Sequence, residues 1–228
     1  MIRLGIRLGI RLGVVIAALV LAASARAQEK LAPARGVFLV AKSEIQDGPF
    51  YQSVVLLLAH SDKGSLGLIV NRPTEVPVSE ALPELGGKTA HELYYGGPIA
   101  LDGLLFLVRS DHQPRPPRPP GPSWNAERVL DDVDYSGDRT LLDELMRLET
   151  KSDALRLFIG HSGWAPGQLD AELARGSWDV VQADAATVFT KEPKLMWLEL
   201  SRDSRLMARS RSSRLSRPSS RSARAEVR

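Results

Sequence analysis

One segment, residues 160–169, combines residue types that could bind a ligand or react with one. It reads GHSGWAPGQL and follows a short apolar run. If it joins a strand to a helix, free backbone N–H groups at the helix start can receive an anion or a carbonyl oxygen. Trp164 could stack on a planar ligand, and Gln168 could donate and accept hydrogen bonds. The competing interpretation is structural, with glycines that permit close packing and Trp164 as a core side chain.

The same segment contains a serine, Ser162, that could serve as a nucleophile. A nucleophile elbow needs glycine two positions after the serine, because a bulky side chain clashes in the strained turn. The second residue after Ser162 is Trp164. His60, His91 or His112 with one of many aspartates could complete a triad on paper, but almost any sequence offers that. A serine hydrolase using Ser162 is therefore an alternative and not the leading interpretation.

The chain has few residues that could bind a metal ion or a cofactor. There is no cysteine, which excludes disulfides, thiol nucleophiles and thiolate metal sites. The four histidines lie in separate segments without partners at ligand spacing. The glycine-containing turns at 64–67 and 96–98 lack the lysine and hydroxyl of a phosphate-binding loop. We expect no metal, no cofactor and no catalytic residue.

Two further bends complete the candidate binding surface, NRP at 71–73 and GGP at 96–98. Arg72, in the first bend, would pair with an Asp or Glu of the domain or bind an anionic ligand. The partner would be an unidentified small molecule or a protein, provided that folding brings the bends together. The candidate ligand-binding residues are Asn71, Arg72, Pro73, Gly96, Gly97, Pro98, Gly163, Trp164, Pro166, Gly167 and Gln168.

Short strands come first in the chain and helices are mixed in later. Asp138 is expected to cap a helix over 140–149, and Pro166 and Pro193 to begin two more. This order predicts an α+β fold and not an alternating parallel sheet. A brief helix is expected at 78–85, and strands are expected at 36–42, 52–59, 65–70, 92–95, 104–109, 155–159 and 177–182, with a hairpin turn at 60–64.

Positive charge is concentrated at the two ends. Four arginines and no acid lie in 1–27, and nine arginines with two acids lie in 202–228. Of the 30 basic and 27 acidic residues, 17 and 25 remain for 28–201, which leaves a net charge of −8 there. An acidic body is a poor nucleic-acid binder by its field alone.

Residues 1–27 have the three parts of a secretory signal peptide: three early arginines, an apolar run at 13–23 and Ala-Arg-Ala at 25–27. The run is shorter than the roughly 20 residues of a spanning helix. We expect cleavage before Gln28, no membrane span after cleavage, and a periplasmic or secreted protein. An uncleaved anchor or an unusual start site is the alternative.

The remaining division of the chain follows from composition. After the signal peptide we expect a linker at 28–35, a single domain at 36–201 and a disordered Arg/Ser-rich tail at 202–228. The tail would contact an anionic surface, nucleic acid or nothing. Within the domain, 113–123 holds six of the 15 prolines and predicts an exposed polyproline loop.

Several segments in a fixed order resemble the YqgE/AlgH family of bacterial proteins. They are GVFLVA at 36–41, GPFYQSVVLLLAH at 48–60, GSLGLIVNRP at 64–73, YYGGPI at 94–99 and GHSGWAPGQLDAEL at 160–173. The resemblance covers about 36–200. It implies a single domain with a mixed, mainly antiparallel, partly barrel-like sheet and helices packed outside. It implies no established enzymatic activity, and the family carries a label as transcriptional regulators and is usually cytoplasmic.

We therefore expect an exported, non-enzymatic binding or regulatory domain. A transcriptional regulator acting in the cytoplasm is the alternative that the family label suggests. The acidic body and the lack of a recognisable helix-turn-helix give that alternative no support. The export signal, the proline-rich loop and the tail are departures from the family pattern.

Overall fold

The structure is a computed structural model that describes residues 31–83, 91–109 and 125–215, with side chains as far as residue 204. The expected signal peptide, the proline-rich loop at 113–123 and the end of the tail lie outside the described residues. Everything below concerns the body that begins at Pro33.

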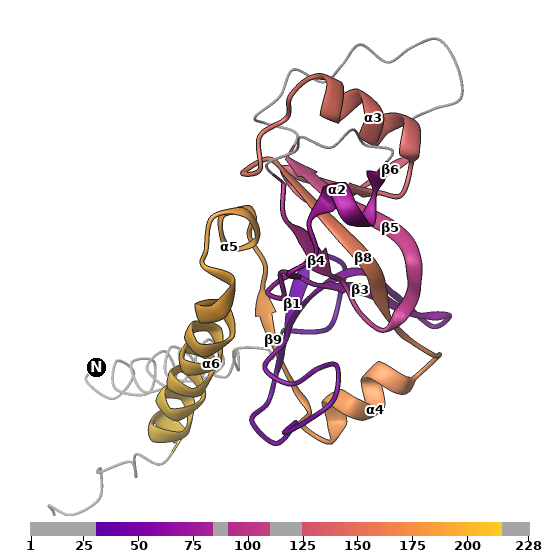
Figure 1. Cartoon of the computed structure of the whole chain (residues 1–228). Helices are drawn as coiled ribbons and strands as arrows, with labels where there is room; N and C mark the ends of the chain where they lie inside the picture. The colour runs from indigo at the N-terminus through magenta and orange to yellow at the C-terminus, as the bar shows by residue number, and fades with distance from the viewer. Residues whose placement is uncertain (1–30, 84–90, 110–124, 216–228) are drawn as a thin grey trace, which may run out of the picture. The chain divides into compact units, whose positions relative to one another are not determined.

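Nine strands of the described chain form one sheet (Figure 1). Their order is β6-β7-β5-β8-β3-β2-β1-β9, and β4 pairs with β8 off this path. The β4–β8 ladder is parallel and the others are antiparallel, which confirms the mixed, mainly antiparallel sheet. The strands are β1 (Val37–Ala41), β2 (Val54–Ser61), β3 (Gly64–Ile69), β4 (Leu93–Tyr95), β5 (Ile99–Arg109), β6 (Ala126–Leu130), β7 (Val133–Ser136), β8 (Leu155–Trp164) and β9 (Trp178–Gln182).

Five helices accompany the sheet within the described residues. α6 packs on β1 and β9, whereas α4 packs on β3 and β9. Apolar residues of α2 and α3 join a third cluster with β4, β5 and β8. None of these helices is both long and apolar enough to cross a bilayer. The helices are α2 (Val78–Ala81), α3 (Arg139–Arg147), α4 (Gln168–Ala174), α5 (Ala185–Phe189) and α6 (Pro193–Leu215).

Strand β1, which lies between β2 and the edge strand β9, is buried on both faces. Phe38 and Val40 face a cluster that includes residues of α5 and α6. Val37 and Leu39 face the opposite cluster, which includes Leu169 of α4. Since successive side chains of a strand point to opposite faces, covering both faces requires the continuous apolar run that this segment has.

The sheet curls without closing. Arg35, just before β1, donates to the Arg128 carbonyl at 3.1 Å and contacts Glu127 Oε2 at 2.8 Å, both on β6. No strand ladder joins β6 to β9 among the described residues, so both stay edge strands. The expected α+β domain is thus confirmed, with a sheet that is curved but open.

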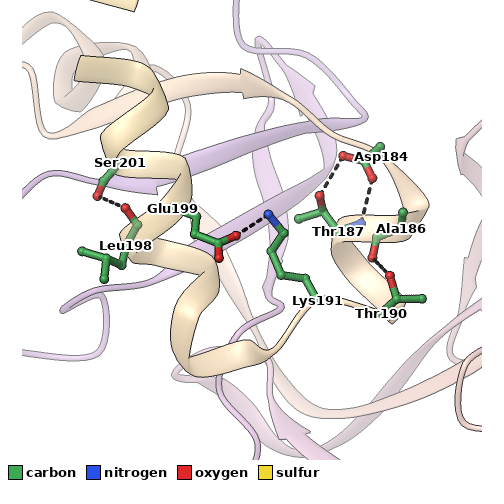
Figure 2. A network of polar contacts seen from close by, with 8 residues as sticks. All are labelled: Asp184, Ala186, Thr187, Thr190, Lys191, Leu198, Glu199 and Ser201. Carbon is green, nitrogen blue, oxygen red and sulfur yellow. Dashed lines mark hydrogen bonds and ion pairs between the residues drawn. The ribbon is translucent and has the colours of Figure 1, made fainter. Parts of the chain in front are cut away.

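The connection from α5 to α6 is held by local polar contacts (Figure 2). Asp184 Oδ1 accepts from the Thr187 backbone N–H at 2.7 Å and caps α5. Lys191 Nζ then contacts Glu199 Oε2 at 2.6 Å. Trp197 Nε1 donates to the Ala41 carbonyl at 2.6 Å, which fixes α6 on β1. These contacts place Phe189 and the start of α6 over the sheet.

The end of α6 differs from the sequence expectation. A disordered tail was expected from residue 202, but the helix continues to Leu215. Arginine is a good helix former and serine is tolerated, so a helix already nucleated by a packed first half extends at little cost. The strands β6 and β7 and the short α5 were not expected at all.

Candidate functional site

The segment 160–169 is mostly strand. β8 continues through Trp164 and pairs with β3, with Ser65 opposite Trp164 and Gly67 opposite Ser162. Only residues 165–167 connect β8 to α4. The expected strand end at 159 was therefore wrong, because antiparallel pairing with β3 carries the strand five residues further. The helix also starts later than expected, at Gln168 with Gly167 as its N-cap.

The bend at 96–98 lies directly against β8. Gly96 donates to the Ile159 carbonyl at 2.8 Å, and its own carbonyl accepts from Ile69 at 2.9 Å. A Cβ placed on Gly97 would lie 2.4 Å from the His161 carbonyl carbon and oxygen. The two glycines therefore serve close backbone approach, while Pro98 is exposed.

The bend at 71–73 holds the loop between β1 and β2. Asn71 accepts from the Val54 N–H at 2.8 Å and donates to the Gln52 carbonyl at 2.9 Å. Gln52 has φ = 50°, a left-handed conformation that is costly for a residue with a side chain. The bend also meets strand β4, through a bridge between Pro73 and Tyr94.

Arg72 is committed to the same loop. Its guanidinium donates to the Pro49 carbonyl at 2.6 Å and to the Tyr51 carbonyl at 2.7 Å. Burial lowers its pKa below the ordinary value, and Tyr95, whose ring lies 5.8 Å away, opposes that shift. The arginine thus pairs with carbonyl groups, whereas the sequence suggested a carboxylate or an anionic ligand.

Trp164 is part of an aromatic cluster. It is 5% exposed, stacks on Phe50 at 5.8 Å and meets Trp178 edge-on at 6.1 Å. Glu172 Oε2 accepts from both indole N–H groups, at 3.0 Å from Trp164 and 2.8 Å from Trp178. Gln168 donates to the other oxygen of Glu172 at 3.0 Å. This geometry favours the structural interpretation of Trp164 and Gln168.

The three bends are linked but do not form one open cavity. The 71–73 and 96–98 bends meet through β4, and the second meets β8 at 160–162. The 164–168 part lies in the aromatic cluster and reaches Arg72 only through the loop that carries Phe50. Gly163 lies within β8, and Pro166 and Gly167 are exposed beside α4. Ligand binding at these residues stays a prediction.

Ser162 is placed where it cannot meet a substrate. Its side chain is fully buried and its hydroxyl donates to the Gly96 carbonyl at 3.1 Å. A different serine has a histidine beside it, however. Ser65 Oγ lies 2.8 Å from His60 Nδ1, and His60 Nε2 lies 3.8 Å from Asp170 Oδ1. The second distance is longer than a hydrogen bond.

A pocket of about 310 Å³ opens where β4, β8 and α5 meet. Arg156 of β8 lies in its wall and is 7% exposed. Its guanidinium lies 4.3 Å from the Tyr94 ring centre and 5.9 Å from that of Phe189. The full lining is Glu92, Tyr94, Ser152, Asp153, Leu155, Arg156 and Phe189.

The electrostatics of this pocket depend on the one buried cation. Burial lowers the pKa of Arg156 below its ordinary value, and Tyr94 and Glu92 oppose the shift. Burial likewise raises the pKa of Tyr94 to about 12, and Arg156 works against that rise. Tyr94 Oη donates to Glu92 Oε2 at 2.9 Å. At neutral pH the pocket therefore presents a guanidinium cation, a neutral phenol and carboxylates.

Sequence reasoning missed Arg156, Glu172 and Phe50. A signal for the first was present: Arg156 is the charged residue in an otherwise apolar strand that was expected to be buried. Nothing local marks Glu172 or Phe50, since their roles depend on partners distant in sequence. No group of three or more His, Cys, Asp or Glu side chains in the described part of the chain is placed to hold a metal ion.

The curved open sheet, its helices and the linked bends define a single α+β domain whose motifs contact one another. A family model described as AlgH-like matches residues 38–207. The chain belongs to this family, which confirms the resemblance found in the sequence.

Known proteins agree with this assignment. A UPF0301 protein of Streptomyces coelicolor is 35% identical over 173 residues, which is 75% of this chain and 86% of that protein. A UPF0301 protein of Cytophaga hutchinsonii is 32% identical over 164 residues, or 72% of this chain and 85% of that protein.

Two solved structures are similar to this one. A crystal structure of a Corynebacterium diphtheriae protein has a TM-score of 0.62 at 26% identity, covering 78% of this chain and 90% of that one. The solution structure of AlgH from Pseudomonas aeruginosa has a TM-score of 0.55 at 24% identity, covering 87% of this chain and 100% of that one. At this level of identity, the similarity to AlgH shows a shared fold alone.

Proposed function

We propose that this protein is a non-enzymatic binding domain and that its ligand site is the pocket lined by Arg156. The observation that carries the proposal is the buried guanidinium in the pocket wall. A buried charge is costly unless it is paired and hydrogen-bonded. An anionic group of a ligand would supply that pairing.

The contacts of Arg156 within the protein support this reading. Its hydrogen bond is a long one, 3.4 Å from Nη1 to the Val70 carbonyl. Its guanidinium carbon also lies over the Tyr94 ring at 4.3 Å and over the Phe189 ring at 5.9 Å, which are cation–π contacts. Arginine presents five N–H donors in the plane of the group, so most of its capacity is left for a ligand.

A simple anion tests the site. Acetate titrated into the full chain should raise the melting temperature, measured against chloride at equal ionic strength, because a ligand that binds only the folded state stabilises it. Arg156→Met should remove the acetate effect, whereas Arg175→Gln, at an exposed position, should keep it. An acetate effect that is absent in the natural chain, or retained in Arg156→Met, would contradict the proposal.

We also propose that the domain is exported, since residues 1–27 have the pattern of a signal peptide. N-terminal sequencing of the native protein tests this directly. A start at Gln28 supports export with cleavage. A start at Met1 in protein recovered from the cytoplasm would contradict it.

Our proposal of a non-enzymatic domain also predicts that Ser65, the serine with a histidine beside it, is not a nucleophile. The Ser65–His60–Asp170 arrangement has the residue types of a catalytic triad, although the histidine–aspartate distance is 3.8 Å. A fluorophosphonate probe should label the natural chain and Ser162→Ala but not Ser65→Ala if this serine is a nucleophile. We expect no labelling of any of the three, because the aspartate does not hold the imidazole by a hydrogen bond.

A further inference from the structure

We propose that the pocket takes a free α-amino acid, a small zwitterion that carries a carboxylate and an amine. This inference rests on the proposed binding function and names the ligand class for the same site. It follows from three features of the pocket: the guanidinium, the carboxylates and the volume.

The guanidinium of Arg156 would bind the carboxylate of the ligand. Tyr94 covers one face of Arg156 at 4.3 Å, and Phe189 lies at 5.9 Å. The N–H groups of a guanidinium point along its edges, where pairs of them match the two oxygens of a carboxylate. The planar rings also restrain the guanidinium, so a ligand need not order it on binding.

The carboxylates of the pocket would attract the ammonium group of the ligand. Glu92 and Asp153 line the pocket together with Arg156, so these charged lining groups sum to −1. Glu192 lies close enough to contribute to the raised pKa of Tyr94, which places further negative charge nearby. These groups would weaken the binding of a purely anionic ligand at Arg156, whereas an ammonium group beside the carboxylate would be attracted to them.

The volume limits the size of the ligand. A volume of about 310 Å³ is at the lower end for ligand pockets, which are typically about 300–1,000 Å³. Leu155, Tyr94 and Phe189 contribute a few apolar atoms to a mainly polar lining, to which Ser152 adds a hydroxyl. The volume suits one amino acid better than a nucleotide or a peptide.

Three matched probes test the inference by calorimetry on the full chain. They are L-leucine, 4-methylpentanoate, which lacks the amine, and 3-methylbutylamine, which lacks the carboxylate. We expect leucine to bind about tenfold more tightly than either, since each charged contact is worth about one factor of ten at most in a half-open site. Equal affinity for leucine and 4-methylpentanoate would overturn the amino-acid assignment.

Charge-neutral variants should change the affinities for two of the probes in opposite directions. Glu92→Gln with Asp153→Asn keeps acceptor oxygens, including one for the Tyr94 hydroxyl, but removes the negative charge. Leucine affinity should fall about fivefold to tenfold while 4-methylpentanoate affinity rises. The exposed Glu80→Gln should change neither. A parallel fall for both probes in the double variant would overturn the inference.

The test separates this inference from the proposed function. Arg156-dependent binding of 4-methylpentanoate without a preference for leucine would support an anion-binding domain and overturn the amino-acid assignment. Binding of no probe, in a chain whose melting curve is normal, would overturn both. Arg156→Lys, which keeps the charge but loses the planar fork, should weaken leucine binding and keep part of it.

Discussion

Single residues in this domain stabilise the fold through partners that are distant in sequence. Glu172 is the example, because one carboxylate of α4 accepts hydrogen bonds from the indoles of β8 and β9 and from Gln168. Trp164 and Glu172 belong to the segment 160–173 that carries the family resemblance, and Trp178 follows it in β9. The aromatic cluster therefore depends on a glutamate for its polar contacts.

Replacing Glu172 by Leu should lower the free energy of unfolding by about 3 kcal/mol, because two indole N–H groups lose their acceptor in a partly buried position. Glu172→Gln should cost less than half of that, since its amide oxygen can still accept. Urea unfolding followed by tryptophan fluorescence measures both. A loss for Leu no larger than that for the exposed Glu80→Gln would mean that the shared carboxylate contributes nothing.

Two glycines of the 160–169 motif allow a matched comparison. Gly160 and Gly167 have similar left-handed conformations, with φ of 63° and 73°. A Cβ on Gly160 would lie 2.4 Å from the Gly97 carbonyl oxygen, whereas a Cβ on Gly167 would meet nothing within 4 Å. The first glycine is therefore required by both conformation and space, and the second by conformation alone.

Gly167→Ala should lower the free energy of unfolding by about 1 kcal/mol, the cost of a left-handed non-glycine residue. Gly160→Ala should cost about 3 kcal/mol or more, because the 96–98 bend must also move. Chemical denaturation of both variants gives the comparison. Equal losses would show that the close contact between the bend and β8 is not tight in solution.

At the scale of elements, apolar strands could be predicted from sequence and polar ones could not. The expected runs at 36–42, 52–59 and 65–70 correspond to β1, β2 and β3, and the expected hairpin turn joins β2 to β3. Strands buried on both faces have continuous apolar sequences, so a short apolar run bounded by turn residues indicates them. Their order across the sheet is set by contacts distant in sequence and could not be derived from local pattern.

The missed strand β6 has a physical explanation in its charged residues. β6 is the sheet edge and carries Glu127 and Arg128, both exposed. Charged side chains on an edge strand hinder pairing with other chains, but they also remove the apolar alternation by which a strand is recognised. The same reasoning explains the site: the bends were visible as motifs, whereas the Arg156 pocket needs three elements to meet.

The cap of α3 is an element-scale prediction that the structure confirms. Asp138 Oδ1 accepts from the Thr140 N–H at 2.8 Å and from the Leu141 N–H at 3.3 Å. Asp138→Ala should lower the free energy of unfolding by about 1 kcal/mol. The control is Asp143→Ala in the same helix, whose exposed pair with Arg139 should contribute almost nothing. Thermal or urea unfolding that ranks the two variants in reverse would contradict the capping role.

On the scale of the whole molecule, the family motifs meet across the sheet and make separate strands depend on one another. The loop after β1 is held by the bend after β3, and its Phe50 packs on the last residue of β8. Changes at one motif should therefore reach the others, and unfolding of the body should be cooperative. Protonation of groups buried in this body is one way to test that coupling.

Two histidines make the stability of the whole body depend on pH. Burial lowers the pKa of His91 below its ordinary value of 6.5, against hydrogen bonds to the Thr150 and Leu155 backbone, and burial also lowers that of His161. As the pH falls below 6.5, the unfolded chain binds these protons before the folded chain does. The free energy of unfolding should therefore be fully retained above pH 6.5 and decline as the pH falls toward the folded-state values. In urea titrations between pH 7.5 and about 5.5, a range that lies above the ordinary carboxyl pKa values, His91→Gln with His161→Gln should flatten this decline. An unchanged slope in the double variant would assign the decline to other groups.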